Sequence, residues 1–123
     1  MSTGDRVELA EVLASTGEQA GVIWSLQNSG DLNANLVHFG AGEGVREHVN
    51  DEVDVLVIGV SGSGEARVND TSHRLFAGTL IFIPKGARRS TRGASGDFAY
   101  VSIHRRRGPL EIGGKRRGER SEE

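Results

Sequence analysis

The chain has 123 residues, a formal net charge of −2 at pH 7 and no cysteine. This length fits one domain with a single hydrophobic core. Because there is no cysteine, disulfides and thiolate chemistry are excluded, and we expect a cytoplasmic location. No apolar run approaches the ~20 residues that span a bilayer, and the first residues lack a signal-peptide pattern, so no membrane association is expected.

Charge is distributed unevenly along the chain. Residues 1–104 contain 8 Lys and Arg against 13 Asp and Glu, whereas residues 105–123 contain 7 against 4. An acidic body is therefore followed by a basic tail, which has no hydrophobic alternation and is predicted to be partly disordered. Because no aromatic residue is interleaved with the basic ones, we expect a solvated tail and no nucleic-acid partner.

An N-terminal arm is predicted over residues 1–20, with a short helix over residues 7–14 where apolar residues follow a helical spacing. A barrel domain is predicted over residues 21–104. There the apolar segments are short and are separated by turns rich in glycine, asparagine and serine. These segments are, in order, GVIWSL, NLVHF, DVLVIGV, EARV, HRLF, LIFI and FAYVSI. Short strands without intervening helices predict an all-β sandwich or barrel.

Two segments of the predicted barrel carry the spacing of a known family. The first runs Gly40, five residues, Arg46, Glu47, His48, three residues, Glu52, six residues and Gly59. The second runs Gly78, five residues, Pro84, Lys85, Gly86, two residues, Arg89, three residues and Gly93. They resemble the two motifs of the cupin superfamily, G-x5-H-x-H-x3,4-E-x6-G and G-x5-P-x-G-x2-H-x3-N. The resemblance implies a double-stranded β-helix, or jelly-roll cupin barrel, that forms a homodimer through its N-terminal strands.

Two of the four positions at which a cupin holds a metal are arginine in this chain. Arg46 and Arg89 stand where the family pattern has histidine. Arginine stays protonated and has no lone pair to give to a metal. Only His48 and Glu52 remain of the implied ligand set, and His104 could add a third ligand if it faces inward. We expect no cofactor; the alternative is a divalent metal at His48, Glu52 and His104, with oxygenase or isomerase chemistry.

The preferred hypothesis is a metal-free pocket for a small organic anion, in an enzyme or in a sensor. Alternate residues of a strand share a face, so we expect Arg46 and His48 to point the same way. Two guanidiniums could then hold a carboxylate or phosphate, with His48 as the candidate catalytic acid or base. The candidate ligand-binding residues are Arg46, Glu52, Asp54, Arg89, Tyr100 and His104. A third hypothesis, a non-catalytic scaffold in which an arginine pairs with Glu52, stays open.

Strand periodicity also predicts which side chains face the barrel interior. After the first motif, we predict an interior row with a polar mouth and an apolar floor, formed by Glu52, Asp54 and Leu56. The opposite row consists of Val53, Val55 and Val57. On the last strand, one face carries Phe98, Tyr100, Ser102 and His104, and the other carries Ala99, Val101 and Ile103. The sequence leaves open which of these two faces is inside.

Overall fold

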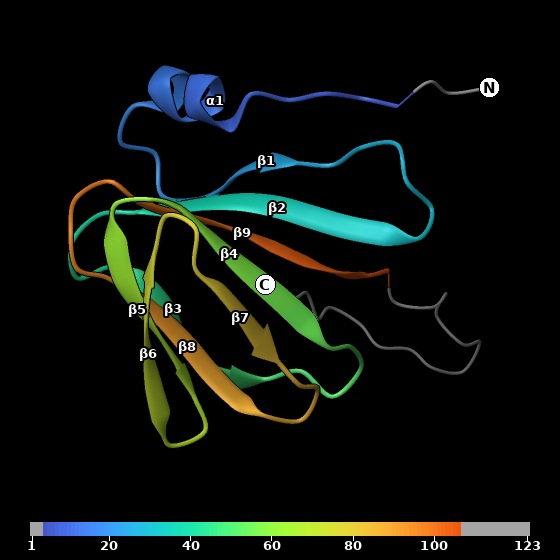
Figure 1. Cartoon of the computed structure of the whole chain (residues 1–123), viewed down its shortest axis with the longest axis vertical. Helices are drawn as coiled ribbons and strands as arrows, with labels where there is room; N and C mark the ends of the chain where they lie inside the picture. The colour runs from blue at the N-terminus through green and yellow to red at the C-terminus, as the bar shows by residue number, and fades with distance from the viewer. Residues whose placement is uncertain (1–3, 107–123) are drawn as a thin grey trace.

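The computed structural model describes residues 4–106, which form a short helix and nine strands (Figure 1). In chain order these elements are α1 (Leu9–Thr16), β1 (Gly21–Ser25), β2 (Leu32–Phe39), β3 (Gly44–Val49), β4 (Val55–Ser61), β5 (Ser63–Val68), β6 (Thr71–Phe76), β7 (Leu80–Ile83), β8 (Arg88–Gly93) and β9 (Phe98–Arg105). Most of the predicted basic tail lies outside the described residues.

The strands form two antiparallel sheets that share one core. Sheet A has the strand order β1-β2-β9-β4-β7, and sheet B has the order β3-β8-β5-β6. Neighbours such as β2 and β9 are far apart in the sequence, so the chain passes repeatedly from one sheet to the other, as in a jelly roll. The predicted all-β class is confirmed. Within residues 4–106, no helix is long and apolar enough to cross a bilayer.

The predicted helix and the seven predicted strand segments are all present. Helix α1 lies two residues further along the chain than expected, next to β1 (Figure 1). The segment LIFI is strand β7 without any change of bounds. Two further strands, β3 and β8, lie outside the predicted apolar segments because their sequences, GVREHV and RRSTRG, are dominated by charged and small residues. They pair with each other in sheet B.

The core lies between the two sheets. Its buried side chains come mainly from alternate positions of both sheets: Val37, Phe39, Val53, Val55, Val57, Ala66, Leu75, Ile81, Ile83, Ala87, Phe98 and Tyr100. The predicted interior face of the segment from residue 52 to 57 is therefore wrong, because Val53, Val55 and Val57 are buried and Leu56 is exposed. Both faces of β4 are apolar, so alternation alone could not tell which one packs inward.

Two glycines of the motifs lie where a side chain would have no room or where the backbone has a positive φ. At Gly59 an added Cβ atom would lie 2.0 Å from the carbonyl oxygen of Phe76. Gly86 has φ 86°, in the turn between β7 and β8, and its amide donates to the carbonyl of Asn50 at 2.8 Å. These requirements arise from strand packing and turn geometry. The motif spacing can therefore report the fold whatever the site binds.

Candidate functional site

The inner face of sheet A changes from apolar to polar along the barrel. On β9 the inward residues are Phe98, Tyr100, Ser102 and His104, and all four are buried. Their antiparallel partners on β2 are, in the same order, Phe39, Val37, Asn35 and Asn33. The open question about the last strand is thus answered: the mixed aromatic and polar face is inside, and it ends in a histidine and two amides.

A hydrogen bond inside the barrel links this face to sheet B. The hydroxyl groups of Tyr100 and Thr91 are 2.9 Å apart, and both side chains are buried. The next inward residue on β8 is Arg89, which is only 1% exposed. Its Nε donates to the carbonyl of Ala87 at 3.0 Å, and its Nη2 donates to the carbonyl of Pro84 at 3.2 Å. Arg89 is therefore an interior residue held against the turn before β8.

Arg46 does not join Arg89. Between β3 and β8 the register pairs Val45 with Thr91 and His48 with Arg89, so three steps on β3 match two on β8. This β-bulge at Arg46 and its neighbour breaks the alternation, and Arg46 lies exposed on the outside. The prediction that Arg46 and His48 share a face is wrong, and the two guanidiniums do not converge. His48 is half-buried opposite Arg89, with its Nδ1 2.9 Å from the carbonyl oxygen of Arg46.

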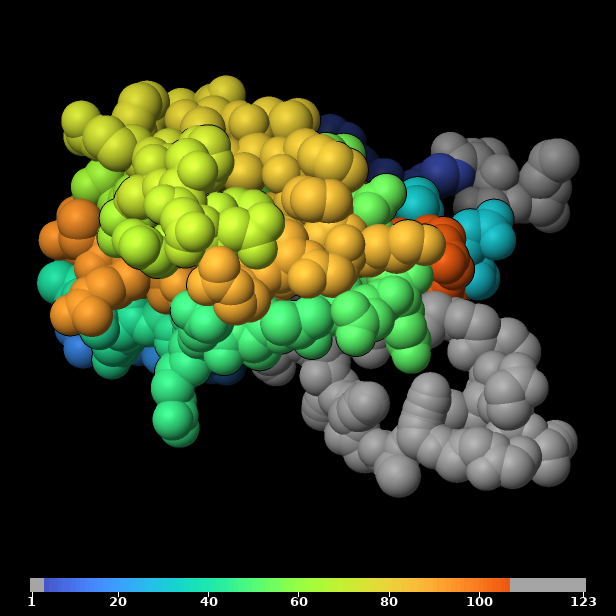
Figure 2. All heavy atoms as spheres, turned by 90° about the horizontal axis from the view of Figure 1, so that it is seen from below, coloured from blue at the N-terminus to red at the C-terminus, as the bar shows by residue number. Residues whose placement is uncertain are grey.

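Glu52 and Asp54 lie in the loop between β3 and β4, and both are exposed. The Asn50 side chain shapes this loop, since its Oδ1 accepts from the amide of Glu52 at 2.8 Å. Asp54 accepts from the amide of Lys85 at 2.9 Å, which ties the loop to the β7–β8 turn. Figure 2 looks at this end of the molecule and shows the loop (green) packed beside the turn (orange). The Asp54 carboxylate thus bridges two loops at the surface, and neither Glu52 nor Asp54 lines the interior.

The cupin motifs imply a bound metal, and the residues of this chain do not fit one. Neither Arg46 nor Arg89 can act as a ligand. Within residues 4–106, no three side chains of His, Asp or Glu gather closely enough to hold a metal ion. The alternative ligand set of His48, Glu52 and His104 is therefore not brought together by the fold.

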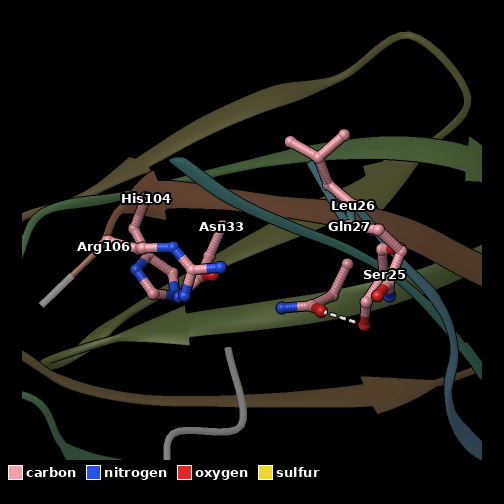
Figure 3. Close-up of a pocket in the computed structure, with 7 residues that line it drawn as sticks. Ser25, Leu26, Gln27, Asn33, His104 and Arg106 are labelled. Carbon is pink, nitrogen blue, oxygen red and sulfur yellow. Dashed lines mark hydrogen bonds between the residues drawn. The ribbon is translucent and has the colours of Figure 1, made fainter. Parts of the chain in front are cut away.

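A partly open hollow of about 370 Å³ lies at the polar end of the inner face of sheet A. Seven residues from β1, β2, β9 and the segments next to them line it: Ser25, Leu26, Gln27, Asn33, Asn35, His104 and Arg106. Figure 3 shows Arg106, His104 and Asn33 grouped at one end of the hollow, and Ser25, Leu26 and Gln27 at the other. Of the predicted site residues only His104 lines it. For Asn33 and Asn35, the available signal in the sequence was their alternation with apolar residues on β2.

The polar side chains of the hollow are oriented by hydrogen bonds. Ser25 Oγ donates to Asn35 Oδ1 at 2.6 Å, which joins β1 to β2 (Figure 3). His104 Nδ1 is 2.9 Å from the carbonyl oxygen of Arg105. A carbonyl can only accept, so Nδ1 carries the proton and Nε2 is the accepting nitrogen of the neutral ring. Arg106 is fixed by its Nε, which donates to the carbonyl of Ser29 at 3.0 Å.

No protein-family model and no curated protein matches the sequence. The fold is nevertheless shared with solved structures. The TT1209 protein of Thermus thermophilus matches with a TM-score of 0.73 at 19% identity, over 84% of this chain and 98% of that one. A conserved Klebsiella pneumoniae protein with a double-stranded β-helix domain matches with a TM-score of 0.69 at 15% identity, over 83% and 90% of the two chains.

A cupin superfamily protein from Desulfitobacterium hafniense matches with a TM-score of 0.58 at 22% identity, over 65% of this chain and 72% of that one. At such identities the likeness concerns the fold and carries no activity. This chain therefore has the double-stranded β-helix fold of the cupins, as its two glycine-spaced motifs predict.

Proposed function

We propose that this protein binds a small polar organic molecule with a carboxylate or phosphate group in the hollow between β1, β2 and β9. The observation that carries the proposal is the lining itself. Six of its seven side chains are polar, one of them is a guanidinium, and none is a carboxylate. Its volume of about 370 Å³ lies within the range of small-molecule sites. The proposed ligand is the kind of anion expected from the sequence, but the arginine at its site is Arg106 and not Arg46 or Arg89.

Arg106 is the proposed anchor for the anionic group. Its Nε is held by the carbonyl of Ser29, so the planar group is oriented before a ligand arrives. The described part of the chain gives its two terminal nitrogens no partner, and a guanidinium of this kind can hold both oxygens of a carboxylate. The amides of Asn33 and Asn35 add N–H groups that suit hydroxyl or carbonyl oxygens on the rest of the ligand.

Binding accounts for the hollow better than acid–base catalysis does. His104 is the single histidine of the lining, and no carboxylate or lysine accompanies it there. Bell-shaped pH profiles of acid–base enzymes report two groups, an essential acid and an essential base. His48, the candidate catalytic residue from the sequence, is not part of the lining. We therefore assign His104 the role of a hydrogen-bonding partner of the ligand.

Isothermal titration calorimetry with three probes tests the proposal: citrate, inorganic phosphate and glucose 6-phosphate. We expect at least one probe to bind. Arg106→Gln should weaken that binding by about 10- to 100-fold, because hydrogen bonds to a charged group contribute roughly 1.5–3 kcal/mol. Arg92→Gln, at an exposed position of β8, is the matched control and should leave the affinity unchanged.

Two results would overturn the proposal: no binding of any probe by a folded protein, or equal affinity in the Arg106→Gln variant. Titration of protein that has been treated with EDTA and then dialysed free of the chelator separates the metal alternative. The arginine-anchored site predicts the same affinity before and after this treatment, whereas a site that binds through a metal would lose its ligand when the metal is removed.

A further inference from the structure

One end of the hollow brings together three polar side chains of different hydrogen-bonding character. Figure 3 shows Arg106, His104 and Asn33 grouped there, and we call these three residues the charged end. Asn33 is directly opposite His104 in the antiparallel register of β2 and β9. The pairing continues beyond β9, because the amide of Arg106 donates to the carbonyl of Asp31 at 2.6 Å. His104 and Arg106 are therefore alternate residues of one extended segment, on the same side of the sheet and roughly 6.8 Å apart along the backbone.

The three side chains of the charged end differ in what they offer to a ligand. Arg106 has donors only, and because its Nε donates to the carbonyl of Ser29, its terminal nitrogens remain for a ligand. His104 offers an acceptor, since Nδ1 lies against the carbonyl of Arg105 and Nε2 carries the lone pair of the neutral ring. The amide of Asn33 has both a donor and an acceptor. The charged end thus combines a cationic fork with an adjacent acceptor and an adjacent amide donor.

We infer that the ligand is a 2-hydroxy carboxylic acid, with its carboxylate on Arg106 and its hydroxyl group between His104 and Asn33. This inference rests on the proposed function and narrows the ligand to one chemical class. A hydroxyl group donates one hydrogen bond and accepts others, so it can donate to His104 Nε2 and accept from the amide of Asn33. In a 2-hydroxy acid the hydroxyl-bearing carbon is bonded to the carboxylate carbon. The two groups therefore reach neighbouring side chains of the charged end at the same time.

Other small carboxylates match the charged end less well. A 2-oxo acid has a carbonyl oxygen at this place, which only accepts, so it brings no donor to His104 Nε2. An acid without the hydroxyl group has no polar atom there and would leave both His104 Nε2 and the Asn33 amide facing apolar carbon. A site built to hydrogen-bond a hydroxyl group discriminates against the analogue that lacks it, because polar groups of the site are then left unpaired.

The middle of the hollow adds a donor further from Arg106. Ser25 Oγ donates to Asn35 Oδ1 at 2.6 Å, so the amide nitrogen of Asn35 is the group that remains for a ligand. A second carboxylate of the ligand suits this nitrogen, whereas a cationic group does not, because no carboxylate lines the hollow. We therefore expect hydroxy acids with a further carboxylate, such as malate and citrate, to bind more tightly than lactate.

Isothermal titration calorimetry with two matched pairs of probes tests the inference. Citrate and tricarballylate differ by one hydroxyl group, and so do malate and succinate. We expect the hydroxy acid of each pair to bind about tenfold more tightly, because the other acid forms fewer hydrogen bonds and leaves polar groups of the site unpaired. The wild-type protein is sufficient for this comparison, so the test does not depend on the folding of a variant.

Two variants separate the roles of Arg106 and His104. Arg106→Gln should weaken both members of a pair by a similar factor, because it removes a contact to the carboxylate that they share. His104→Leu should reduce the preference for the hydroxy acid to about twofold or less, because the hydroxyl group then loses its acceptor. His73→Leu, at an exposed position of β6, is the matched control and should keep the full preference. Circular dichroism establishes that each variant is folded, and Asn33→Ala replaces His104→Leu if the leucine prevents folding.

Equal affinity within both pairs would overturn the inference. If Arg106→Gln still weakened the binding of these acids, the proposed ligand site would stand with a different class of ligand. Binding of inorganic phosphate or glucose 6-phosphate without binding of any hydroxy acid would have the same meaning. A full preference that survives in the folded His104→Leu variant would also overturn the inference, because the hydroxyl group would then be recognised elsewhere. Absence of binding of every probe would refute the proposed function as well.

Discussion

The hydrogen bond between Tyr100 and Thr91 joins the two sheets inside the barrel, and its contribution to stability can be measured. Tyr100→Phe removes one hydroxyl and leaves the buried Thr91 hydroxyl without this partner. A buried hydrogen bond contributes about 0.5–1.5 kcal/mol net, and a buried polar group left unsatisfied costs about 1–3 kcal/mol. We expect Tyr100→Phe to lower the free energy of unfolding by about 1–2 kcal/mol, and Thr91→Val to lower it by a similar amount.

The double variant separates this bond from the other effects of each substitution. Once one hydroxyl is gone, removing the second should cost little, so the two single costs should exceed the double cost by about 1 kcal/mol. Urea unfolding of the four proteins measures this coupling, and in thermal unfolding 1 kcal/mol corresponds to about 4 °C. Thr71→Val, at an exposed position of β6, controls for the change of residue type. Strictly additive costs would refute the idea that this contact stabilises the barrel.

Three further substitutions test the backbone and the polar interior. Gly59→Ala should cost more than about 2 kcal/mol in urea unfolding, because its Cβ would lie 2.0 Å from the carbonyl of Phe76 and strands must shift. Asn50→Ala should lower the free energy of unfolding by about 1–2 kcal/mol, because the Asn50 Oδ1 accepts from two amides of the loop before β4. A variant as stable as the wild type would contradict this role. Ser102→Ala should be neutral or stabilising by up to about 1 kcal/mol, because within the described residues the buried Ser102 Oγ has no hydrogen-bond partner; a clear loss of stability would contradict that.

The fold was predictable from the sequence because its signals are local. Gly59 and Gly86 stand where strand packing or a turn admits no side chain or needs a positive φ, and such requirements leave a fixed spacing. The apolar segments between turns marked seven of the strands. The strands β3 and β8 have no apolar segment, because many of their side chains are charged and solvated. Only the motif spacing indicates them in the sequence.

The site was much less predictable, for two physical reasons. The bulge in β3 inserts one residue into the alternation, and no single residue of GVREHV signals it, so Arg46 was expected inside. The second reason is that β4 is apolar on both faces, so the choice of its inner face could not be made from periodicity. Both errors placed residues of the first motif in the interior. The polar residues that do line the hollow come from β1, β2, β9 and the segments next to them, outside both motifs, and only His104 was anticipated.

The bulge in β3 limits how a metal centre could be engineered into this barrel. Arg46→His together with Arg89→His would restore the histidines of the family pattern in the sequence. The strand register, however, places position 89 in the barrel and position 46 on the outside. One new imidazole would then face the core and the other would face water. The two rings would lie on opposite sides of the sheet and could not bind the same metal ion. In this chain the bulge turns position 46 away from the barrel interior, in addition to the change of side chains. Point substitutions alone would therefore not create the metal site.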